Sequence, residues 1–447
     1  MTTLILNAKV VNENSVKETD LLIKNGRIEE LGSNLQHIKA AKVVDASGLF
    51  LIPGMIDDQV HFREPGLTHK AEIASESGAA VAGGITSFME MPNVLPPTVN
   101  AQALEEKFLL ASKKSVSNYS FYLGASHENI EDIKRLDAAR VCGVKVFMGA
   151  STGNLLVDDP KVLESIFQYS PILIATHCEN SDLIKRNYAR ISRNYENGIP
   201  MFEHPNIRDV DACYASSSFA VDLAKRHGSN LHVLHLTTAK ELSLFDKGPI
   251  DKKKITAEAC VHHLWFTEDD YASLDSLIKC NPAIKSKDDR SALRKAISEE
   301  VIDIIATDHA PHTLVEKQKT YDDSPAGIPL VQHALLALLE LCQQGVFSLE
   351  TIVTKTSHNP ARRYQISERG FIREGYWADL VLVDMQKNTK VGDGKLLYKC
   401  GWTPFKDVVF GAKIKATYIN GEEVYDGSKV LTERRFAQEL AFKRQLN

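Results

Sequence analysis

The sequence has no apolar run long enough to cross a membrane. A membrane-spanning helix needs roughly 20 consecutive apolar residues, and no such stretch occurs among the 447 positions. The first residues, Met1 to Val11, alternate like a β-strand and show neither the basic stretch nor the apolar core of a signal segment. We therefore expect a chain that has no membrane partner and resides in the cytoplasm.

Two further absences narrow the class of protein. Lys and Arg (53 residues) do not outnumber Asp and Glu (58), and the net charge of -5 offers no general attraction to nucleic acid. The seven cysteines include no Cys-x-x-Cys pair, which is typical of reduced thiols rather than of a disulfide framework. With 43% hydrophobic and 25% charged residues, the composition excludes a disordered or fibrous chain.

The two ends of the chain have the same pattern of short alternating runs. The runs at Leu4 to Val11 and Leu21 to Ile28 are matched near the other end by Ala378 to Val383 and Lys415 to Ile419. Neither end has enough strands to bury a sheet face alone. We therefore predict a small β-sandwich domain formed by residues 1–52 and 365–447, with a polar helix after about residue 430.

The middle of the chain, residues 53–364, alternates short apolar runs with segments of helical length and spacing. Eight runs are predicted to be strands: Met55 to Val60, Ile85 to Met89, Tyr119 to Leu123, Val144 to Phe147, Pro171 to Thr176, Leu231 to Leu236, Ile255 to Cys260 and Ile302 to Ala306. This pattern predicts an α/β fold, a (β/α)8 TIM barrel, with an open doubly wound sheet as the alternative.

Polar side chains at the ends of these runs favour the barrel. Most of the runs end in residues that can bind metal or carry charge, among them His61, His177, His235 and Asp308. A barrel brings all eight strand ends together on one face, where its active site lies. In an open sheet, strands distant from the crevice would have no use for such residues.

These four residues have the chemistry of a zinc site. They supply imidazole nitrogens and a carboxylate, which suit zinc. Lys145 lies within an apolar run, where a charged lysine is costly. Reaction of its amine with carbon dioxide would produce an anionic N6-carboxylated lysine able to bridge two cations, and the neighbouring ligands make this the favoured interpretation.

Such a centre predicts hydrolysis of an amide. Zinc lowers the pKa of a bound water and polarises a carbonyl, while Asp308 would carry the proton from the attacking hydroxide to the leaving nitrogen. Arg63 follows His61 by two residues and would enter the same mouth, where its planar guanidinium suits a substrate carboxylate. We therefore expect a small acidic molecule as the substrate.

The motifs of the chain, taken in order, resemble those of the dihydroorotases in the amidohydrolase superfamily. The similarity covers nearly the whole length, and its most specific element is Val-His-Phe-Arg-Glu-Pro-Gly at residues 60–66. The other motifs are Met91-Pro92-Asn93, Gly143 to Phe147, Thr176-His177-Cys178-Glu179, His232-Val233-Leu234-His235, His262-His263-Leu264, Asn281-Pro282, Thr-Asp-His-Ala-Pro-His at 307–312 and Pro325-Ala326-Gly327-Ile328.

The resemblance implies reversible cyclisation of N-carbamoyl-L-aspartate to L-dihydroorotate in pyrimidine biosynthesis. It also implies one or two zinc ions held by His61, carboxylated Lys145, His177, His235 and Asp308. Asp308 would in addition be the catalytic acid and base. The substrate carboxylate would be bound by Arg63, Asn93 and His312, and the ring by Asn281 and the backbone of Ala326 and Gly327. We further expect a homodimer.

The chain departs from the family pattern at several positions. Gln59 occupies the place of the first histidine of a His-x-His pair, and a neutral amide oxygen is a weak zinc ligand. Gln59 is therefore expected either to bind one metal weakly or only to hydrogen-bond near it. Cys260-Val261 replaces a common Thr-Pro before His262, and Ala283-Ile284-Lys285 replaces Pro-Leu-Arg, both in loops expected to contact the substrate ring.

Two other functions remain open at this point. One is hydrolysis of another cyclic amide, such as a hydantoin, a dihydropyrimidine or allantoin, although most of these make poor use of Arg63 and Asn93. The other is a catalytically silent structural partner. Gln59 favours this alternative because it replaces an expected metal ligand, whereas the remaining buried ligands argue against it because they cost stability when no metal is bound. We also predict that Cys178 packs rather than binds metal, and that the charged loop 313–324 is a solvated connection rather than a lid.

Overall fold

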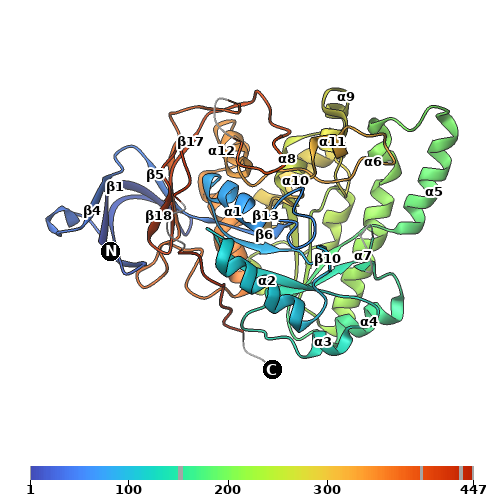
Figure 1. The fold of residues 1–447 in the computed structure, drawn as a ribbon, viewed down its shortest axis with the longest axis horizontal. Helices are drawn as coiled ribbons and strands as arrows, with labels where there is room; N and C mark the ends of the chain where they lie inside the picture. The colour runs from blue at the N-terminus through green and yellow to red at the C-terminus, as the bar shows by residue number, and fades with distance from the viewer. Residues whose placement is uncertain (1, 150–154, 393–395, 432–435, 445–447) are drawn as a thin grey trace.

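The computed structural model describes residues 2–149, 155–392, 396–431 and 436–444. Two large sheets organise this part of the chain, one made by strands from both ends and one made by strands from the middle (Figure 1). The predicted fold class, a parallel α/β barrel with a second sheet from the chain ends, is confirmed. No helix of the described residues is long and apolar enough to span a bilayer.

The barrel sheet contains eight parallel strands that neighbour one another in chain order. They are β6 (Met55–Val60), β7 (Ile85–Glu90), β8 (Asn118–Gly124), β9 (Gly143–Phe147), β10 (Ile174–His177), β11 (Leu231–Val233), β12 (Ile255–Cys260) and β13 (Ile304–Ala306). The first and last strands meet where Val60 bridges His309 in parallel. There, the His61 N–H donates to the His309 carbonyl at 2.7 Å, so the barrel closes beside the predicted metal ligands.

Helices cover the outside of the barrel and explain why its strands read as apolar runs. Every residue of β6 to β11 is buried, as parallel strands covered on both faces require. The longer helices are α1 (Ile73–Ala82), α2 (Ala101–Lys114), α4 (Pro160–Tyr169), α5 (Ser181–Ile191), α7 (Val210–His227), α10 (Lys287–Ser298) and α12 (Ala334–Gln343). The shorter ones are α3 (Ile130–Lys134), α6 (His204–Ile207), α8 (Val261–Trp265), α9 (Tyr271–Leu274), α11 (Leu314–Lys317), α13 (Leu349–Val353) and α14 (Asn359–Tyr364).

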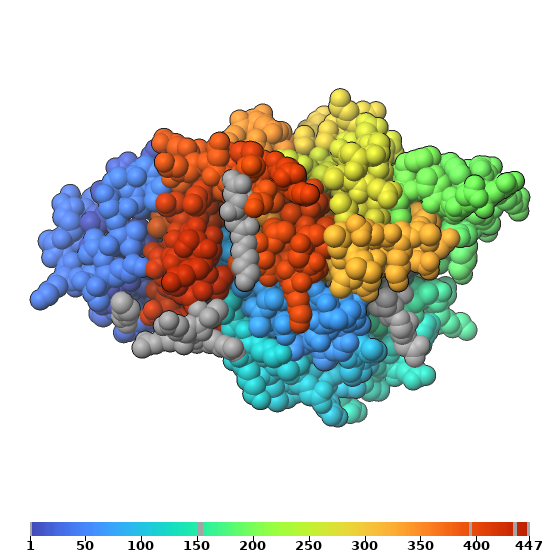
Figure 2. Space-filling view, turned by 45° about the horizontal axis from the view of Figure 1, so that its top comes forward, coloured from blue at the N-terminus to red at the C-terminus, as the bar shows by residue number. Residues whose placement is uncertain are grey.

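The second sheet joins the two ends of the chain, as the matching sequence patterns predicted. Its order is β18-β17-β14-β5-β1-β2-β3, with β4 paired to β1. These strands are β1 (Thr2–Asn12), β2 (Ser15–Lys24), β3 (Arg27–Gly32), β4 (Lys42–Asp45), β5 (Phe50–Pro53), β14 (Leu380–Asp384), β17 (Lys413–Ile419) and β18 (Glu422–Tyr425). The antiparallel pair β5–β14 connects the halves, and the space-filling view shows N- and C-terminal residues side by side at one end (Figure 2).

A tight turn divides one of the predicted N-terminal runs. Within Leu21 to Ile28, the turn residues Asn25 and Gly26 take positive φ angles of 52° and 83° and connect β2 to β3. A short strand at Val409–Phe410 (β16) leaves the sheet and pairs with β15 (Thr389–Lys390). The chain passes from the end sheet to the barrel at Gly54, between β5 and β6.

The predicted C-terminal helix is wrong for residues 436–444, which are extended; residues 432–435 and 445–447 lie outside the described ones. The Leu440 N–H donates to the Tyr119 carbonyl at 2.8 Å, and the Phe442 N–H donates to the Ala139 carbonyl at 3.0 Å. Leu440 and Phe442, two positions apart, are both buried, which is the spacing of a strand. Tertiary hydrogen bonds and burial therefore outweigh the helix propensity of this segment.

Truncation of Leu440 should destabilise the protein. Leu440 is only 1% exposed, and a buried leucine replaced by alanine typically costs about 2–5 kcal/mol. We expect Leu440→Ala to lower the free energy of unfolding by that amount in denaturant titration. Lys443→Ala is the control, because the Lys443 side chain pairs with Glu368 at the surface, its backbone hydrogen bond is kept in the variant, and the loss should be at most about 1 kcal/mol. Equal effects of the two variants would show that the segment is not anchored through Leu440.

Candidate active site

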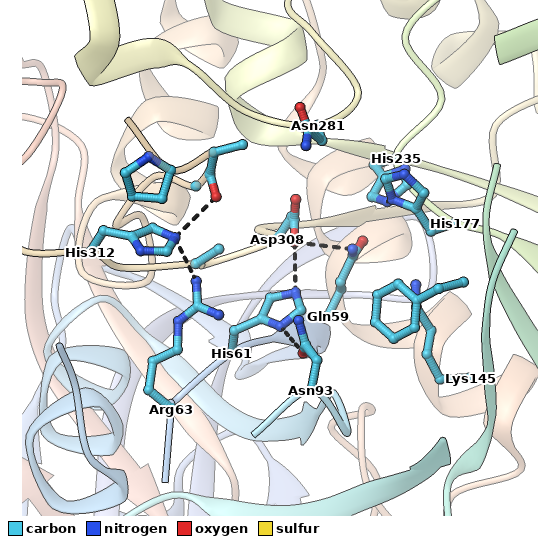
Figure 3. Close-up of a pocket in the computed structure, with 15 residues that line it drawn as sticks. Gln59, His61, Arg63, Asn93, Lys145, His177, His235, Asn281, Asp308 and His312 are labelled. Atoms are coloured by element: carbon cyan, nitrogen blue, oxygen red, sulfur yellow. Dashed lines mark hydrogen bonds and ion pairs between the residues drawn. The ribbon is translucent and has the colours of Figure 1, made fainter. Parts of the chain in front are cut away.

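A cavity of about 260 Å³ opens at the carboxyl ends of the barrel strands (Figure 3). Its lining includes all twelve residues that the sequence predicted for the site: Gln59, His61, Arg63, Asn93, Lys145, His177, His235, Asn281, Asp308, His312, Ala326 and Gly327. Phe147, Ala310 and Pro325 complete the lining and were not predicted. In Figure 3, Arg63 and His312 lie on one side of Asp308, and Lys145, His177 and His235 on the other.

Unusual backbone angles aim three of these side chains into the cavity. Arg63, His235 and Asp308 have φ angles of 68°, 40° and 47°, in the left-handed region that residues other than glycine seldom adopt. Such conformations cost free energy and persist only where surrounding contacts enforce them. At His235 the enforcing contact is the Glu258 carboxylate, which accepts from the His235 N–H at 3.0 Å.

His61 and Asp308 place two hydrogen-bond acceptors close together. The His61 Nδ1–H donates to Asn93 Oδ1 at 2.6 Å, which leaves Nε2 as an acceptor. This Nε2 lies 3.1 Å from Asp308 Oδ1, also an acceptor. Burial lowers the pKa of His61, so its ring is neutral at neutral pH. Two acceptors at this distance call for a cation between them, which is the arrangement of a metal site.

Asp308 is ionised although it is buried. Burial opposes its charge, but the contact with His61 and the nearby positive charge, including that of Lys145, lower its pKa below the ordinary value. Gln59 adds a further hydrogen bond, from its Nε2 to Asp308 Oδ1 at 3.1 Å. The Gln59 amide oxygen instead faces the Cys260 sulfur at 3.8 Å. Gln59 therefore turns its donor, and not its lone pairs, toward the carboxylate.

His177 and His235 form the opposite wall, and a carboxylate orients the first of them. The His177 Nε2–H donates to Glu179 at 2.9 Å, so its Nδ1 points a lone pair at His235 Nε2, 3.0 Å away. Arg208 pairs with the same Glu179 carboxylate. Burial lowers the pKa of both histidines, most strongly that of His235, which keeps them neutral and able to bind metal. A histidine whose other nitrogen is held by a carboxylate is typical of metal ligands.

The orienting role of Glu179 was missed in the sequence, although Glu179 belongs to the quoted motif around His177. Its position two residues after a strand-end histidine was the available signal. Cys178 packs as predicted: it is buried and lies 3.3 Å from Thr176 Oγ1, within hydrogen-bonding distance. All seven cysteines are free thiols.

Lys145 is buried in the cavity wall without a counter-charge. It is 1% exposed, its Nζ lies 4.7 Å from the centre of the Phe147 ring, and no carboxylate of the described residues pairs with it. Burial lowers the pKa of its ammonium to about 8. A minor but appreciable fraction of the amine, about a fifth at pH 7.4, is therefore neutral and nucleophilic, which is what reaction with carbon dioxide requires.

The other end of the cavity carries positive charge. Arg63 is buried: its Nε–H donates to the Pro311 carbonyl at 3.1 Å, and its Nη2 lies 3.1 Å from His312 Nε2, whose N–H donates to the Ala326 carbonyl at 3.0 Å. No carboxylate of the described residues pairs with the guanidinium. Burial lowers the Arg63 pKa only to about 10, so it stays charged. Lys70 donates to His312 Nδ1 at 3.0 Å. Burial and these two cations hold the pKa of His312 well below its usual value, so a neutral imidazole sits between two positive groups.

This end of the cavity suits an anion with a polar ring. The Asn93 oxygen accepts from His61, which leaves the amide nitrogen of Asn93 as a donor. Asn281 Oδ1 is buried without a hydrogen-bond partner among the described residues. The backbone at Ala326 and Gly327 lines the same region, and Gly327 has a φ of 145° and no room for a Cβ beside the Ala310 carbonyl.

The loop 313–324 is largely exposed, as predicted for a solvated connection, but it is anchored to the cavity rim. It contains helix α11, and Lys317 within it is fully buried. The Lys317 ammonium donates to the carbonyls of Lys279, Pro325 and Gly327 at 2.9–3.0 Å. One lysine of this charged loop is therefore buried, and its hydrogen bonds hold the backbone at the rim of the cavity in place.

Comparison with known proteins identifies relatives of the whole chain. A family model described as "Amidohydrolase family" matches residues 50–424. A dihydroorotase of Carboxydothermus hydrogenoformans is 33% identical over 406 residues, covering 89% of this chain and 92% of the relative. A dihydroorotase of Halobacterium salinarum is 32% identical over 421 residues, covering 92% and 96%.

Solved structures share the fold. An L-hydantoinase (dihydropyrimidinase) of Arthrobacter aurescens has a TM-score of 0.93 and 25% identity, with 98% of this chain and 99% of the other covered. A dihydropyrimidinase of Brevibacillus agri has a TM-score of 0.88 and 21% identity over the full length of both chains. The second likeness shows the fold alone.

Uptake of carbon dioxide by Lys145 should depend on pH. Because the reactive form is the neutral amine and the ammonium pKa is about 8, carbamate formation at a fixed dissolved concentration of carbon dioxide should increase as the pH rises through 8. Carbon-13 NMR of the metal-free protein with labelled bicarbonate would detect the adduct. Lys145→Arg should lack the signal, and a signal that persists in this variant would assign the carbamate to another amine.

Proposed function

The chain belongs to the amidohydrolase family and is a hydrolase, and from this premise we propose that it is a zinc-dependent dihydroorotase. Its reaction would be the reversible hydrolysis of L-dihydroorotate to N-carbamoyl-L-aspartate, a step of pyrimidine biosynthesis. The observation that carries the proposal is that one cavity combines a set of neutral metal-binding side chains with a buried, unpaired Arg63. L-Dihydroorotate has the matching two parts, a cyclic amide and a carboxylate.

The donor set fits zinc. His61, His177 and His235 supply neutral nitrogens, and Asp308 and carboxylated Lys145 would supply oxygen, so these five residues would hold one or two ions. When bound there, zinc makes hydroxide available near neutral pH and polarises the amide carbonyl. The close approach of His61 Nε2 and Asp308 Oδ1, 3.1 Å apart, supports this assignment.

Asp308 would transfer the proton of the reaction. Its carboxylate is ionised at neutral pH, so it can accept the proton of the attacking water and deliver it to the ring nitrogen as the amide bond breaks. The hydrogen bond from Gln59 to Asp308 Oδ1 would orient this carboxylate. We therefore assign Gln59 a positioning role and not a place among the metal ligands.

The substrate would be oriented by the positive end of the cavity. Arg63 would pair with the ring carboxylate, and Asn93 and His312 would contribute further hydrogen bonds from its two sides. Asn281, with its unpartnered Oδ1, would accept from a ring N–H. Neutral His312 between Arg63 and Lys70 adds no charge of its own, so the carboxylate would be neutralised chiefly by the guanidinium.

A second candidate is hydrolysis of a hydantoin or a dihydropyrimidine. The similarity to the Arthrobacter L-hydantoinase, at 25% identity over nearly all of both chains, favours it. A buried guanidinium without a counter-ion disfavours it, because a substrate without a carboxylate would leave that charge unpaired. A catalytically silent structural partner is the remaining alternative. The side chains able to bind metal at the strand ends disfavour it, because such a partner would have no need of them.

Turnover of substrates by the zinc-loaded protein tests the function. We expect hydrolysis of L-dihydroorotate, formation of it from N-carbamoyl-L-aspartate, and much slower hydrolysis of hydantoin and dihydrouracil. Asp308→Asn should abolish turnover of dihydroorotate and leave the thermal unfolding transition in place, because the amide cannot accept the proton. Faster hydrolysis of hydantoin or dihydrouracil than of dihydroorotate would overturn the proposal in favour of a hydantoinase. Zinc binding without hydrolysis of any of these substrates would favour a catalytically silent structural partner.

Loss of the Arg63 guanidinium should weaken recognition of the carboxylate. A hydrogen bond to a charged group is worth about 1.5–3 kcal/mol, so Arg63→Met should lower kcat/KM for dihydroorotate roughly 10- to 150-fold. Lys70→Met is a matched control, because Lys70 contacts His312 and Glu316 rather than the open cavity, and its effect should be smaller. Equal losses in the two variants would argue against a direct contact between Arg63 and the substrate.

A further inference from the structure

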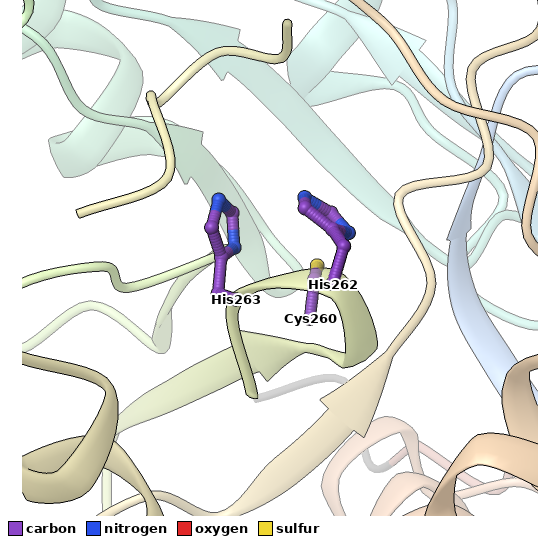
Figure 4. Close-up of side chains that lie close together, drawn as sticks. All are labelled: Cys260, His262 and His263. Atoms are coloured by element: carbon purple, nitrogen blue, oxygen red, sulfur yellow. The ribbon is translucent and has the colours of Figure 1, made fainter. Parts of the chain in front are cut away.

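A second group of side chains able to bind metal lies at the end of β12, and none of its members belongs to the ligands proposed for the catalytic metal. Cys260 is the last residue of β12, and His262 and His263 belong to the first turn of α8. One ligand atom from each of the three lies within 4.8 Å of the others, and all three residues are buried. Figure 4 shows the two imidazole rings standing side by side near the Cys260 sulfur.

The histidines of this group have nitrogens that no described residue satisfies. His262 is fully buried, and the Thr307 backbone is the one polar group of the described residues that adjoins its ring, which leaves at least one nitrogen without a partner. His263 donates from Nε2 to the Pro282 carbonyl at 3.1 Å, which leaves Nδ1 as a buried lone pair without a partner. Buried polar atoms are nearly always paired, so unpaired nitrogens on two adjacent rings indicate a ligand.

We propose that Cys260, His262 and His263 bind a zinc ion separate from the metal of the catalytic cavity. A thiolate with two imidazoles is a donor set that zinc favours. Binding would convert the Cys260 thiol to a thiolate, with its proton released to solvent. The His263 hydrogen bond to a backbone carbonyl is the contact that metal-bound histidines usually make with their second nitrogen.

Other segments contact the cluster on the side away from the His263 Nδ1 lone pair. Cys280 Sγ lies 3.8 Å from His263 Nε2, so a second thiol adjoins the group. The His263–Pro282 contact ties the cluster to the segment that carries Asn281, and the Cys260 sulfur lies 3.8 Å from the Gln59 amide oxygen. The ion would therefore link the end of β12 to two residues of the catalytic cavity, in a structural and not a chemical role.

Cobalt substitution separates this ion from the catalytic metal. The catalytic ligands are nitrogen and oxygen donors, whereas Cys260 is a sulfur donor, and only sulfur produces a thiolate-to-cobalt charge-transfer band in the near ultraviolet. We expect this band in the cobalt-loaded wild-type protein. Its absence at full metal loading would overturn the proposal, whether or not any variant folds.

Two cysteine variants assign the band. Cys260→Ser should lose it together with about one equivalent of metal, and Cys178→Ser should keep both, because Cys178 is equally buried but lies beside His177. A band that survives in Cys260→Ser and disappears in Cys178→Ser would place the thiolate in the catalytic cavity and overturn the proposal. The experiment measures the amount of bound metal and the absorbance of the protein. Its outcome therefore does not depend on whether the protein hydrolyses dihydroorotate.

Discussion

Closure of the barrel between its first and last strands is the constraint on which the site depends. The Asp57 carboxylate accepts from the Thr307 hydroxyl at 2.6 Å and from the Thr307 N–H at 3.2 Å, while His61 donates its N–H to His309. Because His61 follows Asp57 on β6 and Asp308 follows Thr307 after β13, these contacts bring the two side chains to 3.1 Å. Residues about 250 positions apart in the chain thereby become neighbours.

The cavity is divided electrostatically, and burial produces both halves. Around Asp308, burial keeps the three histidines neutral, so lone pairs converge where a cation is favoured. Around Arg63, burial is too weak to remove the guanidinium charge, so a cation faces the space where an anion is favoured. The two ends of the cavity therefore favour opposite charges, and this charge pattern, rather than the fold, is what distinguishes one substrate from another.

Two departures from the family pattern lie in contact with one another. Gln59 and Cys260 are distant in sequence, yet the Cys260 sulfur lies 3.8 Å from the Gln59 amide oxygen. This contact and the hydrogen bond to Asp308 orient the amide from its two ends. The glutamine thus connects the Asp308 carboxylate to the Cys260 thiol, so the two departures belong to one local arrangement.

The sequence by itself determined the barrel, the shared end sheet and the composition of the cavity. Strands covered on both faces must be apolar, and polar residues at their ends have a use only where those ends converge, so His61, Lys145 and Asp308 were recognisable from local pattern. Tertiary structure alone decided the extended segment at Leu440, the buried Lys317, the orientation of His177 by Glu179 and the grouping of Cys260 with His262 and His263. These features depend on hydrogen bonds and burial supplied by other segments or set by the path of the folded backbone, which local patterns of hydrophobicity and charge do not record.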